Sequence, residues 1–139
     1  MGNKLFTGVG VAIVTPFNVD GSVDYDSLKR LVNHIIANGA DFITVLGTTA
    51  ESVTLSQDER EMVVKCVAEE NGGRLPILLG VGGNCTEAVV RDLKSLPYIK
   101  YAQGILSVVP YYNKPSQQGL YEHFKAISEA SPLPIILYN

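Results

Sequence analysis

The segment Thr44-Val45-Leu46-Gly47-Thr48-Thr49-Ala50-Glu51-Ser52 decides the fold, because an apolar run ends there in a small polar loop. The run starts at Phe42 and is short and almost entirely apolar, which is typical of a buried strand in a parallel sheet. Two threonine hydroxyls and several backbone N–H groups follow at the carboxyl end of this strand. Open α/β sheets and α/β barrels bind their ligands at that end. The segment therefore predicts a strand that carries a binding loop for a small anionic substrate.

The same pattern recurs along the chain and predicts alternating strands and helices. Between the apolar runs lie stretches with helical periodicity, with a cap at Asp24, a capping box at Ser56-Gln57-Asp58-Glu59 and Pro97 after the third helix. Strict alternation of this kind predicts a parallel sheet with right-handed crossovers. The five predicted strands are residues 9–14, 42–46, 77–81, 104–109 and 135–138.

Two α/β architectures fit this alternation: a five-stranded doubly wound sheet, and a (β/α)8 TIM barrel, which needs about 250 residues. The last predicted strand, residues 135–138, is followed by no helix that could cover it. A complete doubly wound domain rarely ends on a bare strand. We therefore expect residues 1–139 to be the N-terminal portion of a single (β/α)8 barrel domain, with five of its strands and four of its helices.

The composition is that of an ordinary globular protein and excludes several functional classes. The chain has 139 residues, of which 46% are hydrophobic and 18% charged, and its net charge is −3. Such mild acidity gives no reason to expect nucleic acid as a partner. No apolar stretch approaches the roughly 18 residues of a membrane span, and no secretory leader is apparent. Cys66 and Cys85 are far apart and fit a reducing compartment, so we expect a cytoplasmic protein with no membrane partner.

Hydroxyls and phenols dominate the positions at the predicted strand ends. Glu51 has no second carboxylate beside it, which argues against a glycosidase pair. The sequence contains no set of metal ligands, no Walker loop and no dinucleotide fingerprint, so we expect neither a metal nor a cofactor. The candidates at the strand ends are Thr15, Pro16, Thr48, Thr49, Glu51, Ser52, Gly82, Gly83, Asn84, Cys85, Pro110, Tyr111, Tyr112, Asn113, Lys114, Tyr138 and Asn139.

Each candidate also has a purely structural interpretation. The threonines of the first loop suit a turn, and Tyr111 and Tyr112 suit packing at the rim. Tyr138, within an apolar strand, suits the core. The histidines His34 and His123 lie in amphipathic helices, where we expect surface or edge positions.

Five segments stand in an order and spacing that resemble one enzyme family. They are Ile13-Val14-Thr15-Pro16-Phe17, Gly47-Thr48-Thr49-Ala50-Glu51-Ser52, Pro110-Tyr111-Tyr112-Asn113-Lys114-Pro115-Ser116, Gly119-Leu120-Tyr121 and Ile136-Leu137-Tyr138-Asn139. Together they resemble the dihydrodipicolinate synthases, also called 4-hydroxy-tetrahydrodipicolinate synthases. The resemblance runs through the whole chain and covers about the first half of the family's length.

The resemblance implies a pyruvate-dependent class I aldolase-type lyase on a (β/α)8 barrel. Such an enzyme condenses pyruvate with L-aspartate 4-semialdehyde in lysine and diaminopimelate biosynthesis, and holds pyruvate as a Schiff base on a lysine. It implies catalytic roles for Thr48, Tyr112 and Tyr138 as a proton relay, with Tyr112 lent to a neighbouring subunit of a homodimer or homotetramer. It also implies that Thr48 and Thr49 bind the substrate, with Thr49 holding the pyruvate carboxylate.

The resemblance further implies an effector site for lysine. Ser52, Asn84 and Tyr111 match positions of that site in regulated members of the family. Gln57 and Arg60 stand where some regulated members have histidines. Feedback inhibition by lysine is therefore a hypothesis for this protein.

Two departures from the family pattern bear on activity. Ala50 stands where the family usually has a glycine, and the Schiff-base lysine and substrate-binding arginine of the family lie beyond Asn139. None of the seven lysines present lies inside a predicted strand. A nucleophilic lysine needs a desolvated pocket to lose its proton, so we expect this chain alone to be inactive.

Two alternatives remain open. N-acetylneuraminate lyases and sugar-acid aldolases belong to the same superfamily, although Thr49 and Asn113 favour the synthase. The chain could instead be a non-catalytic half-barrel, a binding or assembly module that pairs with a second copy. The half-barrel interpretation leaves the apolar edges of the first and fifth strands exposed, which promotes aggregation.

Overall fold

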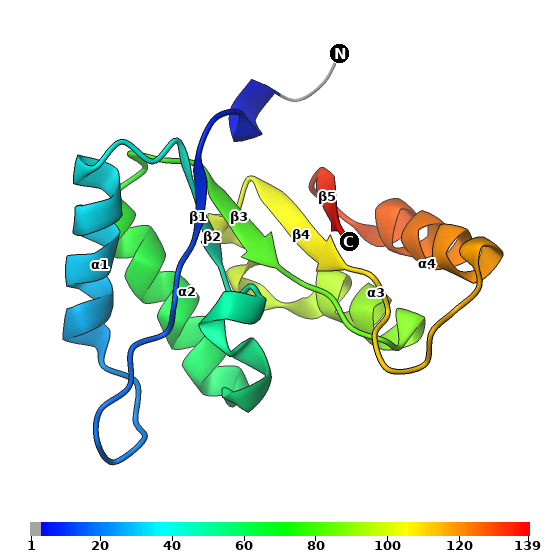
Figure 1. Ribbon diagram of the computed structural model, residues 1–139, viewed down its shortest axis with the longest axis horizontal. Coiled ribbons are helices and arrows are strands. Elements are labelled where there is room, and N and C mark those ends of the chain that lie inside the picture. The colour runs from blue at the N-terminus through cyan, green and yellow to red at the C-terminus, as the bar shows by residue number, and fades with distance from the viewer. Residues whose placement is uncertain (1–3) are drawn as a thin grey trace.

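The computed structural model describes residues 4–139, whose five strands form one sheet with every neighbouring pair parallel (Figure 1). The predicted alternation is confirmed. The strands are β1 (Gly10–Ala12), β2 (Phe42–Val45), β3 (Ile77–Gly80), β4 (Gly104–Val108) and β5 (Ile135–Tyr138). The helices are α1 (Tyr25–Ala37), α2 (Gln57–Asn71), α3 (Thr86–Ser95) and α4 (Gln117–Ala130), and short 3₁₀ helices are η1 (Lys4–Phe6), η2 (Thr48–Ala50), η3 (Ser52–Thr54) and η4 (Pro97–Tyr101).

The order of the strands decides between the two predicted architectures. They follow one another as β1-β2-β3-β4-β5, so each new strand is added on the same side of the last one. A doubly wound sheet reverses this direction at a switch point, whereas a barrel does not. The five strands and four helices are therefore an open part of a (β/α)8 barrel. Helix α1 packs beside α2, and α3 beside α4 (Figure 1).

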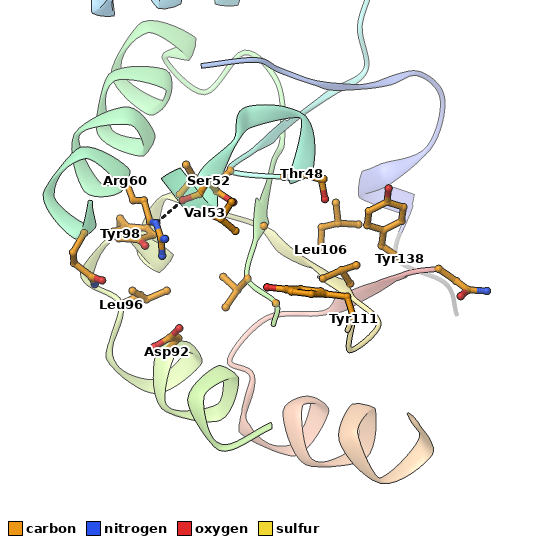
Figure 2. A pocket seen from close by; sticks show the side chains of 18 residues that line it. Thr48, Ser52, Val53, Arg60, Asp92, Leu96, Tyr98, Leu106, Tyr111 and Tyr138 are labelled. Carbon is orange, nitrogen blue, oxygen red and sulfur yellow. Dashed lines mark hydrogen bonds between the residues drawn. The ribbon is translucent and has the colours of Figure 1, made fainter. Parts of the chain in front are cut away.

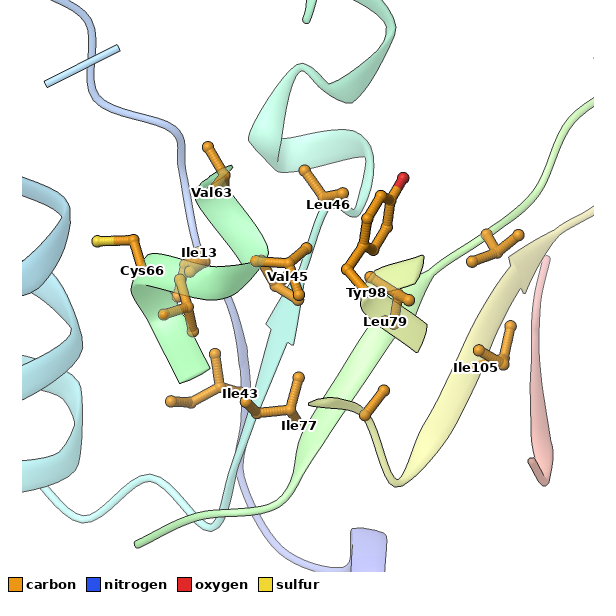
Figure 3. Packing of buried hydrophobic residues seen from close by; sticks show 14 of the residues in the cluster. Ile13, Ile43, Val45, Leu46, Val63, Cys66, Ile77, Leu79, Tyr98 and Ile105 are labelled. Carbon is orange, nitrogen blue, oxygen red and sulfur yellow. The ribbon is translucent and has the colours of Figure 1, made fainter. Parts of the chain in front are cut away.

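The hydrophobic core lies between the outer face of the sheet and the helices. Alternate strand residues such as Ile43, Val45, Leu79 and Ile105 are fully buried against helix side chains (Figure 3). Their neighbours, such as Leu106 of β4, face the opposite side, toward the axis of the barrel. Strands β2 and β3 are buried on both faces, which explains why they appear in the sequence as continuous apolar runs.

The helix boundaries follow the predicted end signals. The Asp24 side chain caps α1 by accepting a hydrogen bond from the Ser27 N–H. The predicted capping box is present at α2, where Ser56 and Glu59 exchange hydrogen bonds. That helix ends at Gly72, in the left-handed conformation. Within residues 4–139, no helix is both long and apolar enough to span a bilayer.

His123 departs from the prediction of a surface or edge position. It is only 4% exposed, and its Nδ1 lies 2.8 Å from the Thr86 hydroxyl. Its Nε2 finds no hydrogen-bond partner among the described residues. The helical periodicity of α4 alone misses this burial because α3 covers that face of the helix. Burial lowers the pKa of the His123 imidazole.

We expect His123 to make the protein less stable as the pH falls from about 7.5 to 5.5. In the unfolded chain a histidine binds a proton near pH 6.5. The folded chain, with its lowered pKa, binds that proton less readily, so acidification favours unfolding. Free energies of unfolding measured in urea at both pH values test this. His123→Gln should flatten the pH dependence.

His34→Gln is the matched control, because His34 is exposed on α1. It should keep the pH dependence of the native chain. The pKa values of Asp20 and Asp24 are also lowered, chiefly by hydrogen bonds from the hydroxyls of Ser22 and Ser27, but these groups titrate below this pH range. An equally steep loss of stability in His123→Gln would contradict the assignment.

Candidate functional site

A pocket of about 660 Å³ opens where β2, β3 and β4 end (Figure 2). It lies at the carboxyl edge of the parallel sheet, where the sequence places the candidate residues. Its lining comes from strands, loops and helices far apart in the sequence: Leu46, Gly47, Thr48, Ser52, Val53, Gln57, Arg60, Gly80, Val81, Gly82, Asp92, Leu96, Tyr98, Leu106, Val108, Tyr111, Tyr138 and Asn139.

Thr48 and Tyr138, two of the predicted catalytic residues, line this same pocket. Figure 2 shows them toward one end of it, together with Leu106 and Tyr111. Tyr138 is 43% exposed, so its interpretation as a core residue is wrong. Strands β2 and β5 are not neighbours in the sheet, yet their ends contribute to one cavity. The open barrel therefore brings a hydroxyl and a phenol from distant segments to one place.

The loop that carries Thr48 leaves β2 through an unusual backbone conformation. Leu46 has φ 55° and Glu51 has φ 53°, both in the left-handed region that non-glycine residues rarely adopt. Between them, Thr48–Ala50 forms the tight turn η2, in which Thr49, a predicted substrate-binding residue, is exposed and does not belong to the pocket lining. Each left-handed residue costs of order 1 kcal/mol, so the surrounding structure must hold this loop in place.

Gly80 of β3 permits that conformation. A Cβ at this position would lie 2.2 Å from the carbonyl oxygen of Leu46 and 2.9 Å from the backbone nitrogen of Gly47. Both are backbone atoms and cannot move aside as the tip of a side chain could. The close approach of the β2 loop to β3 therefore requires glycine at position 80.

The second rim loop turns one of its tyrosines inward and the other outward. Tyr111 lines the pocket. Tyr112, a predicted catalytic residue, has φ 74° and is 91% exposed, and it is not part of the lining. Asn113 donates a hydrogen bond from its side-chain amide to the carbonyl oxygen of Asn84, at 3.3 Å. Within one chain, the structure therefore does not bring Tyr112 to Thr48 and Tyr138.

The predicted effector residues are only partly together. Ser52 and Tyr111 line the pocket, whereas Asn84 is half-buried outside the lining. Gln57 and Arg60 of α2 also line it, and the Arg60 Nε donates a 2.9 Å hydrogen bond to the carbonyl oxygen of Ser52.

The pocket separates charged groups from hydroxyls. Arg60 and Asp92, the lining side chains with formal charges, lie at the end opposite Thr48 and Tyr138 (Figure 2). Beside them, Tyr98 is almost fully buried, and burial raises the pKa of its phenol although the nearby Arg60 opposes this. Chemistry at the Thr48 end would therefore use neutral hydroxyls.

Sequence reasoning missed Tyr98 and Asp92 as parts of the pocket. Neither follows a strand: Asp92 lies within α3, and Tyr98 lies in η4 after that helix. Because no strand end or loop motif marks them, no local signal could have found them. Tyr98 reaches the pocket because α2 packs against η4.

Six lysines have side chains that the structure describes, and none of the six belongs to the pocket lining. All six are exposed: Lys29, Lys65, Lys94, Lys100, Lys114 and Lys125. Among residues 4–139 there is also no cluster of three or more metal-binding side chains.

Two solved structures with a bound molecule resemble this chain. A chloride-inhibited dihydrodipicolinate synthase from Acinetobacter baumannii, complexed with pyruvate, gives a TM-score of 0.88 at 46% identity, covering 95% of this chain and 45% of that one. The enzyme from Cyanidioschyzon merolae with lysine bound gives a TM-score of 0.88 at 42% identity, covering 99% of this chain and 47% of that one.

A third solved structure, whose name mentions no ligand, is equally similar to this chain. The dihydrodipicolinate synthase from Thermotoga maritima gives a TM-score of 0.90 at 47% identity and covers 97% of this chain and 45% of that one. Together with the parallel sheet and its four helices, these likenesses confirm the predicted barrel fold class.

Sequence comparison agrees with the structural likeness. A 4-hydroxy-tetrahydrodipicolinate synthase from Flavobacterium psychrophilum is 57% identical over 136 residues, which are 98% of this chain and 46% of that protein. The chain thus spans about half the length of the curated relatives that it matches. A model of the Dihydrodipicolinate synthetase family matches residues 5–139, and the chain therefore belongs to that family.

Proposed function

We propose that this chain is the N-terminal portion of a 4-hydroxy-tetrahydrodipicolinate synthase. The enzyme is a lyase that condenses pyruvate with L-aspartate 4-semialdehyde in lysine and diaminopimelate biosynthesis. The observation that carries the proposal is the convergence of Thr48 and Tyr138 on one pocket at the carboxyl edge of a parallel barrel sheet. The name of the Flavobacterium psychrophilum relative and the pyruvate in the Acinetobacter baumannii complex support the choice of reaction and substrate.

In this proposal Thr48 and Tyr138 move protons during formation of the imine between pyruvate and a lysine. That step transfers protons to and from the oxygen and nitrogen of a carbinolamine. Linked hydroxyls can do this without a charged base, which suits an end of the pocket that has no charged side chain. Thr49 holds the pyruvate carboxylate through its hydroxyl and backbone N–H.

Tyr112 completes the relay only from another subunit. Its side chain is exposed and outside the pocket of its own chain. We therefore propose a homodimer or homotetramer in which Tyr112 reaches the pocket of a neighbouring copy.

A reducing cytoplasm suits the protein, because both cysteines are free and Cys85 is exposed. Cell fractionation would test the location.

The proposed reaction can be measured in a chimaera in which this chain replaces the matched segment of the Flavobacterium psychrophilum relative. We expect the chimaera to consume pyruvate and aspartate semialdehyde. Thr48→Val and Tyr138→Phe should each lower kcat about 100-fold or more, the usual loss when a proton-transfer group is removed. Tyr121→Phe, on the exposed face of α4, is the matched control and should leave kcat unchanged.

Substrate choice separates the proposal from its closest alternative. A chimaera that cleaves N-acetylneuraminate and ignores aspartate semialdehyde would assign the protein to the lyases of that name. Full activity in both Thr48→Val and Tyr138→Phe would remove the proposed relay.

We also propose that the Schiff-base lysine comes from outside these 139 residues. Each of the six described lysine side chains is exposed, whereas a nucleophilic lysine needs a desolvated pocket. With pyruvate and borohydride, we expect no covalent adduct on the 139-residue chain. The chimaera should be labelled at a lysine outside the segment that this chain supplies. Mass spectrometry that finds a stable adduct on the chain itself would contradict this.

Lysine is the proposed effector. Ser52 and Tyr111 line the pocket, and the Cyanidioschyzon merolae relative has lysine bound. The lining carries one positive side chain, Arg60, and one negative side chain, Asp92, so it offers a lysine ammonium no net attraction, and we expect inhibition only at millimolar concentrations. Titration of the chimaera with lysine tests this: a rate that stays flat through that range removes the effector site.

A further inference from the structure

A buried hydroxyl outside the pocket holds the loop that carries Thr48 and Thr49. Thr15 lies between β1 and α1, is 5% exposed, and donates a 2.8 Å hydrogen bond from its Oγ1 to the carbonyl oxygen of Ala50. Ala50 is the last residue of η2 and is itself almost fully buried. The contact joins segments 35 positions apart in the sequence.

The loop has little else to fix it on this side. Its own backbone hydrogen bonds are local: the Ala50 N–H bonds to Gly47 and the Glu51 N–H to Thr48. The left-handed residues Leu46 and Glu51 flank it. Such a conformation persists only where neighbouring structure imposes it. Arg60 provides a hydrogen bond from the other direction, to the carbonyl oxygen of Ser52.

The conformation of Thr15 is restricted in a way that favours this hydrogen bond. The following residue is Pro16, which restricts the backbone of Thr15 to extended conformations. A buried threonine on a restricted backbone has few ways to point its hydroxyl. Without that donor, the buried carbonyl oxygen of Ala50 would lose its hydrogen bond and the loop would move to find another.

We propose that Thr15 is a positioning residue: its hydroxyl, by holding the carbonyl of Ala50, sets the position of Thr48 in the pocket lining and of Thr49 next to it in the loop. This rests on the proposed function, because those two threonines are the groups proposed to act on pyruvate. Displacements of about 1 Å can cost two orders of magnitude in rate when reacting groups must be aligned. Thr15 touches no substrate in this scheme and acts only through the loop.

The test compares Thr15→Val with Thr15→Ser in the same chimaera. Valine keeps the shape of threonine but cannot donate, whereas serine keeps the donor. We expect Thr15→Val to lower kcat/KM for pyruvate about 10- to 100-fold, with a Tm within about 5 °C of the unsubstituted chimaera. Thr15→Ser should stay within about threefold of the unsubstituted chimaera. Should Thr15→Val not fold, Thr15→Ala removes the donor without adding atoms.

Thr54→Val is the matched control. The hydroxyl of Thr54 also donates a 2.8 Å hydrogen bond to a carbonyl of this loop, that of Glu51, but the contact is local and exposed. We expect little change in kcat/KM. A loss in Thr54→Val as large as in Thr15→Val would overturn the proposal, and so would equal losses in Thr15→Val and Thr15→Ser or normal kinetics in Thr15→Val.

Hydrogen exchange separates this inference from the proposed reaction. The amides of Ala50 and Glu51 should exchange faster in Thr15→Val than in the unsubstituted chimaera and in Thr15→Ser. Equal exchange in all three would overturn the inference whatever the activity. The unsubstituted chimaera could prove inactive while exchange at Ala50 and Glu51 is still faster in Thr15→Val than in Thr15→Ser. That result would refute the proposed reaction and support the role of Thr15 in holding the loop.

Discussion

The parallel hydrogen-bonded pairing of five strands in chain order is the constraint on which the rest depends. The register runs without interruption from β1 to β5, with Thr44 of β2 opposite Leu78 of β3 and Leu106 of β4 opposite Gly80. Because all strands run the same way, every carboxyl end meets one rim. Because their order is sequential, the sheet curves toward a barrel and the rim encloses a pocket. The side chains that could do chemistry are brought together by backbone pairing rather than by contacts of their own.

The two loops at this rim store backbone strain. The non-glycine residues of the described chain that have positive φ are Leu46, Glu51, Tyr112 and Lys114, and all four follow β2 or β4. Strain of this kind concentrates at functional sites, where the scaffold imposes a conformation that the loop alone would not choose. Here Gly80 leaves room for the backbone of the β2 loop because it has no side chain, and the hydroxyl of Thr15 donates a hydrogen bond to that loop. The geometry of the site therefore depends on residues that do not belong to it.

Chemistry by neutral hydroxyls fits this scaffold. A charged base would have to be desolvated at the rim, at a cost that threonine and tyrosine avoid. The charged side chains of Arg60 and Asp92 lie at the opposite end of the pocket, so they place no formal charge beside Thr48 (Figure 2).

The sequence by itself determined the local structure: the five strands, the caps at Asp24 and Ser56, and the rim position of Thr48. These signals lie within a few residues of one another, and a strand that is buried on both faces appears in the sequence as a continuous apolar run. The resemblance implied that Tyr138 acts with Thr48 and that Tyr112 serves a neighbouring subunit. Only the tertiary structure showed that Tyr138 shares a pocket with Thr48, that Tyr112 is exposed outside its lining, and that His123 is buried. Those outcomes depend on strand order and on which helix covers which face, and both are set by contacts between segments that no local pattern encodes.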